Sequence, residues 1–104
     1  MPKKEERLTK KDFNGLSRRE LIRDPFFDVG YVQATSLKVA CIISKKTIKR
    51  AVDRNKAKRK LYNLFSINKP QKPYIIIFYP KKDVLYTPFP ELSAKMKEIF
   101  AKLK

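Results

Sequence analysis

Histidine is absent from this sequence of 104 residues, and cysteine occurs only at position 41. Without histidine, the chain has neither the commonest general base nor the commonest metal ligand of proteins. One cysteine cannot form an internal disulfide, and a structural zinc site is excluded as well. We therefore expect no catalytic residue and no metal ligand in the chain. Cys41 lies in an apolar run and is predicted to be a small core residue in a reducing compartment.

Long apolar runs are also missing. The first 12 residues are charged and contain no apolar stretch, which argues against a signal peptide. The longest apolar run, at residues 74–79, is too short to span a bilayer. The N-terminal segment has no glycine for myristoylation. These absences predict a cytoplasmic protein with no membrane partner.

Acidic residues are few: 10 Asp and Glu stand against 26 Lys and Arg, which gives a formal net charge of +16. So much charge of one sign disfavours a compact state, and a polyanionic partner would relieve the repulsion. Lysine and arginine neutralise phosphates and release condensed counterions, so nucleic acid is the expected partner. The acids are dispersed, and no pair of carboxylates suggests a two-metal site.

The spacing of apolar residues and prolines predicts one domain over residues 1–104, with residues 1–7 flexible. The link of Thr35 and Ser36 is short, so we expect the strands on either side of it to pair as a hairpin. The fold class is an α+β sandwich with helices on a small mixed sheet. The predicted elements are a short helix after Thr9, an edge strand at 20–23, strands at 26–34 and 37–43, a helix ending near Asn68, a strand at 74–79 and a helix opened by Pro88 and Pro90.

A basic block at residues 45–60 carries the clearest functional pattern. One acid interrupts it, Asp53, which is expected in the first helical turn, where negative charge is favoured. A solvated helix normally alternates both signs of charge, so this block favours nucleic-acid binding. The helical period places on one side, for packing on the sheet, Ala57, Leu61, Leu64 and Phe65. It places on the opposite side, facing outward, Asn55, Lys58, Arg59 and Tyr62. For Asn55, a specific hydrogen-bonding role and a cap of the first turn both remain open.

Residues 45–59, KKTIKRAVDRNKAKR, resemble the signature K-K-x-x-R-R-A-x-x-R-N-R-x-K-R of the bacterial ribonuclease P protein. Lys49 and Lys56 stand where that signature has arginine, and Tyr62 stands where the family often has arginine. Lysine keeps the charge but loses the bidentate fork of arginine. Two flanks are similar as well: residues 8–13 to the family's L-T-x-x-x-F, and residues 74–80 to its strand after the basic helix.

This resemblance implies the α-β-β-β-α-β-α sandwich of ribonuclease P proteins, a ribosomal S5 domain 2-like fold with a left-handed crossover around the basic helix. It implies the protein subunit of an enzyme that removes the 5′ leader of precursor tRNA in a Mg²⁺-dependent endonucleolytic step. The RNA subunit would carry the chemistry and hold the Mg²⁺, with none held by the protein alone. The expected partners are ribonuclease P RNA and precursor tRNA, and no protein partner is required.

The resemblance also suggests roles for individual residues. Contact with the catalytic RNA is expected from Arg54, Asn55, Lys58 and Arg59. Phosphate clamps are expected at Lys45, Lys46, Lys49, Arg50 and Lys56. Phe13 matches the family position that lines the leader-binding groove, and Phe27 and Tyr31, which share one strand face, are further groove candidates. For these two strand aromatics a core position is the open alternative, with the strand face that holds Phe26 then exposed.

Composition alone leaves three rival functions open. They are a small ribosomal or other structural RNA-binding protein, a DNA-binding module whose basic helix enters the major groove, and a nuclease that acts without RNA. Only the signature at residues 45–59 separates the ribonuclease P protein from these classes.

Overall fold

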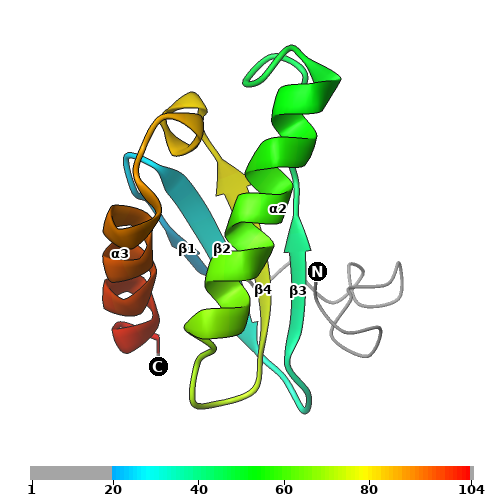
Figure 1. Ribbon diagram of the computed structural model, residues 1–104. Coiled ribbons are helices and arrows are strands. Elements are labelled where there is room, and N and C mark those ends of the chain that lie inside the picture. The colour runs from blue at the N-terminus through cyan, green and yellow to red at the C-terminus, as the bar shows by residue number, and fades with distance from the viewer. Residues whose placement is uncertain (1–19, 104) are drawn as a thin grey trace.

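A computed structural model describes residues 20–103 of the chain as a four-stranded mixed sheet with its helices on one face (Figure 1). The elements are β1 (Glu20–Ile22), β2 (Phe27–Gln33), β3 (Lys38–Cys41), α2 (Ala51–Ile67), β4 (Tyr74–Pro80), the 3₁₀ helix η3 (Lys82–Leu85) and α3 (Phe89–Ala101). Their order agrees with the α+β order that the sequence predicts. The predicted helix after Thr9 lies outside the described residues.

The strand order in the sheet is β1-β2-β4-β3, so the predicted hairpin between β2 and β3 is wrong. β4 lies between them, antiparallel to β2 and parallel to β3. Five of the seven residues of β4 are buried, and such a strand, apolar on both faces, is most stable in the centre of a sheet. β2 and β3 are therefore not neighbours although the link between them is short, because the apolar strand β4 occupies the central position between them.

The connection from β3 through α2 to β4 is left-handed. In Figure 1 both strands point upward, α2 lies in front of the sheet, and the chain passes from β3 on the right to β4 on the left. Crossovers of this hand are rare. The family resemblance implies this handedness, which no residue pattern in the sequence indicates.

The core lies between the sheet and the two long helices. As predicted, the apolar stripe of α2 is buried, with no side chain more than 1% exposed at Ala57, Leu61, Leu64 and Phe65. The ring of Phe78 in β4 meets the ring of Phe65 at 6.2 Å and the ring of Phe27 at 5.8 Å, both edge to face. From α3, Leu92, Met96 and Ile99 complete the core. The outer surface of α2 is therefore held in a fixed orientation by the packing behind it.

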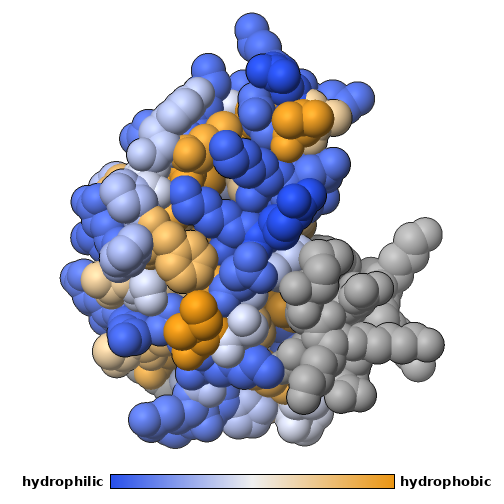
Figure 2. Space-filling view, viewed as in Figure 1, coloured by the Kyte–Doolittle hydropathy of each residue, from blue (hydrophilic) through white to orange (hydrophobic). Residues whose placement is uncertain are grey.

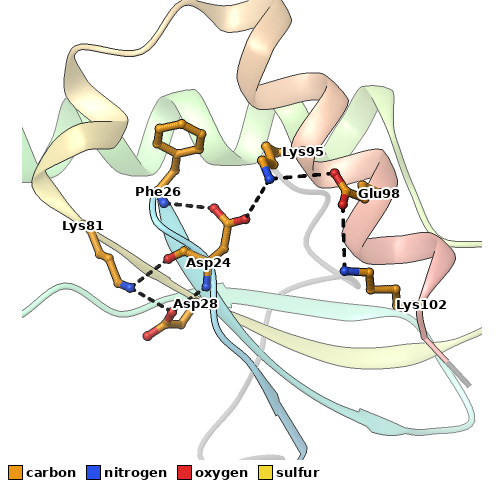
Figure 3. Close-up of polar contacts among 7 residues, drawn as sticks. All are labelled: Asp24, Phe26, Asp28, Lys81, Lys95, Glu98 and Lys102. Atoms are coloured by element: carbon orange, nitrogen blue, oxygen red, sulfur yellow. Dashed lines mark hydrogen bonds and ion pairs between the residues drawn. The ribbon is translucent and has the colours of Figure 1, made fainter.

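A polar cluster ties the turn between β1 and β2 to the rest of the sandwich (Figure 3). Asp24 is buried, and its Oδ1 accepts the backbone N–H of Phe26 at 2.9 Å. Lys81, just after β4, donates to the Asp24 carbonyl at 2.7 Å and lies 3.2 Å from Oδ1 of Asp28. Lys95 of α3 approaches Oδ2 of Asp24 at 3.9 Å. Three segments far apart in the sequence are thus joined at one corner of the sheet.

Truncation of Leu64 tests whether the α2 stripe anchors the helix. Leu64 is fully buried, so Leu64→Ala removes apolar contacts and leaves a cavity. We expect the free energy of unfolding to fall by about 2–5 kcal/mol in urea denaturation. The neighbouring exposed residue is the control: Asn63→Ala should change stability by less than about 0.5 kcal/mol. Equal losses in the two variants would show that this face does not anchor α2.

Candidate nucleic-acid interface

The outward surface of α2 is cationic. We call its residues Asn55, Lys56, Lys58 and Arg59 the α2 ridge. Asn55 and Arg59 are exposed, as predicted, whereas Lys58 is half-buried. Lys56, which the pattern did not place on the outward side, is exposed as well. Figure 2 shows hydrophilic surface along much of α2. Val52, an exposed apolar residue, lies on α2 about one turn before the ridge begins. The ridge therefore presents positive charge next to a small apolar spot on a rigid helix.

The segment before α2 is a hydrogen-bonded turn. The Thr47 amide donates to both the carbonyl and the hydroxyl oxygen of Ser44 at 3.1 Å, and the Ile48 amide donates to the same carbonyl at 3.2 Å. The side chain of Ile48 is buried in the core. This anchor fixes the turn, and Lys45 and Lys46 are exposed on it. Basic charge thus continues from the α2 ridge onto a second ordered element.

Lys49 and Arg50 join the turn to the helix, and both are exposed. Nε of Arg50 lies 3.9 Å from Oδ2 of Asp53, which occupies the first turn of α2 as predicted. Because the Arg50 side chain is largely exposed, this ion pair contributes little to stability. The guanidinium of Arg50 is therefore available to an anionic partner.

Arg54 has a role that the sequence analysis did not assign to it. Its Nη1 donates to the carbonyl of Ile48 at 3.0 Å and to that of Lys49 at 2.7 Å. At about 100° per residue, Arg54 lies nearer to the buried stripe than to the outward side, so its side chain reaches back to the turn. The structure therefore separates Arg54 from the exposed α2 ridge and shows it holding the turn against the helix.

Lys60 also has a structural role that sequence reasoning missed. Its Nζ donates to the carbonyls of Val84 at 3.0 Å and Thr87 at 2.6 Å, which joins α2 to the segment before α3. Desolvation, and then the charge of Lys56, lower the pKa of Lys60. Lys60 lies one turn after Ala57 and one turn before Leu64, at the edge of the apolar stripe. This position is the sequence signal that could have indicated its partial burial.

The prediction that Tyr62 faces outward is wrong. Its side chain is half-buried and packs against the core cluster. Tyr62 lies one turn before Phe65 and about 60° from it around the helix, so its ring can reach the border of the buried stripe. The outward row is correspondingly shorter than the sequence pattern predicts.

The prediction that Phe27 and Tyr31 line a leader-binding groove is wrong. Phe27 is 0% exposed and Tyr31 is 8% exposed, and both pack on the sheet face that the helices cover. The hydroxyl of Tyr31 donates to Oε2 of Glu20 at 2.8 Å, which raises the pKa of Tyr31. The open alternative, a core position, is the correct one. Phe13, the remaining groove candidate, lies outside the described residues.

Cys41 is a core residue, as predicted, and no nucleophile at neutral pH. Burial raises the pKa of its thiol to about 12, against a small opposing effect of Lys58. Only the thiolate is a strong nucleophile, and it is not populated at neutral pH. Within residues 20–103, no three His, Cys, Asp or Glu side chains gather into a possible metal site. Over the same range, no helix has the length and apolar character needed to cross a membrane.

Comparison with known proteins gives one consistent result. The Ribonuclease P family model matches residues 1–104, the whole chain. The ribonuclease P protein component of a Nitratiruptor species is 30% identical over 100 residues, which cover 92% of this chain and 89% of that protein. These matches favour the ribonuclease P protein over the ribosomal and DNA-binding alternatives.

Solved structures share the fold. The RNase P protein from Thermotoga maritima superposes with a TM-score of 0.81 at 21% identity, over 95% of this chain and 98% of that one. A Staphylococcus aureus RNase P protein mutant with defective mRNA degradation activity gives a TM-score of 0.79 at 20% identity, over 94% and 87% of the two chains. At these identities the likeness supports the fold alone.

Removing the guanidinium of Arg54 should loosen the turn. Arg54→Met keeps the aliphatic length but leaves the carbonyls of Ile48 and Lys49 without this donor. We expect a loss of about 1–2 kcal/mol in the free energy of unfolding and faster amide hydrogen exchange at residues 45–49. The matched control is Arg59→Met on the exposed ridge. Similar exchange in both variants would refute the anchoring role of Arg54.

The buried thiol of Cys41 should make the free energy of unfolding fall as the pH rises above 9. The pKa of Cys41 rises from 9.0 to about 12 on folding, so above pH 9 only the unfolded chain loses this proton. The contribution of Cys41 to the free energy of unfolding is therefore complete below pH 9. Above pH 9 it declines by about 1.4 kcal/mol per pH unit, up to the pKa of the folded state. Urea denaturation between pH 8.5 and 11 should give a steeper decline for the natural chain than for Cys41→Ala. Parallel pH profiles would contradict the shifted pKa.

Proposed function

The chain belongs to the ribonuclease P protein family, and on that premise we propose that it binds the catalytic RNA subunit through the α2 ridge and the preceding turn. In the same proposal it binds the 5′ leader of precursor tRNA and so assists endonucleolytic removal of the leader. The chain itself contributes binding and placement. The observation that carries this proposal is the division of α2 into a buried apolar side and an exposed cationic side.

The rigidity of the α2 ridge favours binding to a folded RNA. The stripe behind it is fully buried, so the backbone that carries Lys56 and Arg59 is already in place before binding. A preorganised surface loses less conformational entropy on association than a flexible basic tail. Asn55 is exposed on the same side and adds an amide that can donate to and accept from RNA. This supports contact with one defined place on the RNA.

The turn before α2 supplies further phosphate contacts in this proposal. Lys45 and Lys46 are exposed on the turn, and Lys49 and Arg50 lead into the helix. Arg54 fixes the turn relative to the ridge through its hydrogen bonds to two carbonyls. Two cationic elements in fixed relative orientation can match phosphates on neighbouring RNA strands, which a single straight row cannot do.

For the leader we propose the sheet face opposite α2. Alternation along β2 and β4 places Val32, Ile75 and Tyr79 on that face, where each is half-buried, together with Ile77, which is buried. Tyr79 can offer a ring on which an unpaired base stacks. These residues take the place of Phe27 and Tyr31, whose face the helices cover. Phe13 stays a candidate from the family resemblance alone.

Magnesium is the ion that the family resemblance implies. Carboxylate oxygens are its preferred protein ligands, and within residues 20–103 no three His, Cys, Asp or Glu side chains gather around a possible site. In the proposal the RNA subunit holds the ion.

Reconstitution tests the proposal. The purified chain, mixed with a bacterial ribonuclease P RNA at low Mg²⁺, should increase cleavage of precursor tRNA at its 5′ leader. Lys56→Gln/Arg59→Gln should weaken binding to the RNA and flatten its salt dependence, by roughly one unit of log–log slope or somewhat less per lost phosphate contact.

The matched control is Lys82→Gln/Lys102→Gln, which removes the same charge from exposed positions outside the ridge. Its RNA affinity should stay close to that of the natural chain. If both double variants lose equal affinity, net charge and not the ridge determines binding. If the natural chain does not stimulate cleavage at any Mg²⁺ concentration, the subunit function itself is rejected.

A further inference from the structure

A cavity of about 550 Å³ lies at the opposite end of α2 from the cationic turn. It opens between the C-terminal end of α2, the segment at residues 68–73 and the last turns of α3. In Figure 1 these helix ends lie side by side, and Figure 2 shows apolar surface at the end of α2 with hydrophilic surface around it. Its volume is within the roughly 300–1,000 Å³ of small-molecule sites.

One part of the cavity wall is apolar and aromatic. Phe100 is half-buried, and its ring is braced by Phe65 at 6.2 Å and Phe78 at 6.4 Å. Tyr74, also in the wall, packs edge to face against a neighbouring tyrosine ring at 6.0 Å. Ile67 lines the mouth and is 63% exposed, although it is a large apolar side chain. A flat, apolar group would cover this surface.

The rim is cationic. Three exposed lysines, Lys69, Lys72 and Lys97, line the cavity, and no Asp or Glu is among its described lining residues. The other side of α3 differs, because Lys95 and Lys102 there are paired with Glu98. Within residues 20–103, neither Lys72 nor Lys97 has a hydrogen-bond or ion-pair partner. The rim therefore complements an anion.

Asn68 adds an unpaired polar group to the cavity wall. The residue is 8% exposed, and its Nδ2 donates to the Leu64 carbonyl at 3.0 Å and to Oγ of Ser93 at 2.9 Å. Because a carbonyl can only accept, the contact with Leu64 fixes the orientation of the amide. Its Oδ1 is buried and has no donor among the described residues. Because Oδ1 has almost no accessible surface, Asn68 closes the cavity wall and does not offer this acceptor to an occupant.

We propose that this cavity binds one unpaired nucleotide of the RNA partner. The base covers the apolar wall at Ile67 and Phe100, and the phosphate lies at Lys72 and Lys97. Two features of the cavity match two parts of a nucleotide: the apolar, aromatic surface matches a flat base, and the lysine rim matches a phosphate. The identification of the source as RNA rests on the proposed function, whereas the nucleotide chemistry rests on the cavity.

From residue 55 to residue 67 the helix rises by roughly 18 Å. The cavity is therefore a second contact on the same rigid helix, one that recognises an unstacked base, in addition to the phosphate contacts of the ridge.

Titration of the ¹⁵N-labelled full chain with adenosine 5′-monophosphate tests the cavity directly. We expect saturable amide shifts at residues 67–74 and 97–103. Lys72→Gln/Lys97→Gln should weaken this binding about fivefold, since each exposed lysine–phosphate contact is modest. Ile67→Ser, an exposed position whose change spares the fold, should weaken it without changing charge. Lys82→Gln/Lys102→Gln, whose side chains do not line the cavity, is the control.

Three outcomes would overturn the inference. Shifts spread over the basic surface would show nonspecific binding. Inorganic phosphate with the same affinity and the same shifts would show a simple anion site. Unchanged affinity of Ile67→Ser for a ribonuclease P RNA would show that the RNA partner does not use the cavity.

The two proposals can fail separately. Nucleotide binding in the cavity by a chain that does not bind ribonuclease P RNA would reject only the proposed function. Ridge-dependent binding of that RNA without cavity shifts would reject only the nucleotide site.

Discussion

The burial of one side of α2 against the sheet is the constraint on which the other features depend. Ala57, Leu61 and Leu64 are removed from water completely, so rotation of the helix would expose a large apolar area. The same packing determines which side chains remain outside. A chain with a net charge of +16 can thus fold with its cations concentrated on the surface, where a polyanion can neutralise them.

The two ends of α2 are held by different means. At the start, Ile48 is buried and Arg54 donates to two carbonyls of the preceding turn. At the end, Asn68 caps the helix, and its side-chain amide donates to Leu64 and Ser93. Between them, Lys60 joins the helix to the segment before α3. Some cations of the basic block therefore stabilise the fold, while their neighbours remain available to RNA.

The position of β4 explains the distribution of surfaces. With β4 in the centre of the sheet, the chain must cross from β3 through α2, and this crossover places α2 on the same face as α3. The core side chains of β2, including Phe27 and Tyr31, lie under these helices. The opposite face keeps half-buried residues such as Tyr79. One topological choice thus decides which strand aromatics can reach a ligand.

The sequence by itself predicted the four strands, the helices α2 and α3 and, except at Tyr62, the two sides of α2, because helical and strand periodicity are local properties of the chain. It also determined the charge and, through the signature at residues 45–59, the family. Only the tertiary structure decided the neighbours of each strand and the covered face of β2. The physical reason is that alternation along a strand distinguishes two faces but does not say which one the rest of the chain will cover. That outcome depends on contacts between residues distant in sequence, which no local pattern contains.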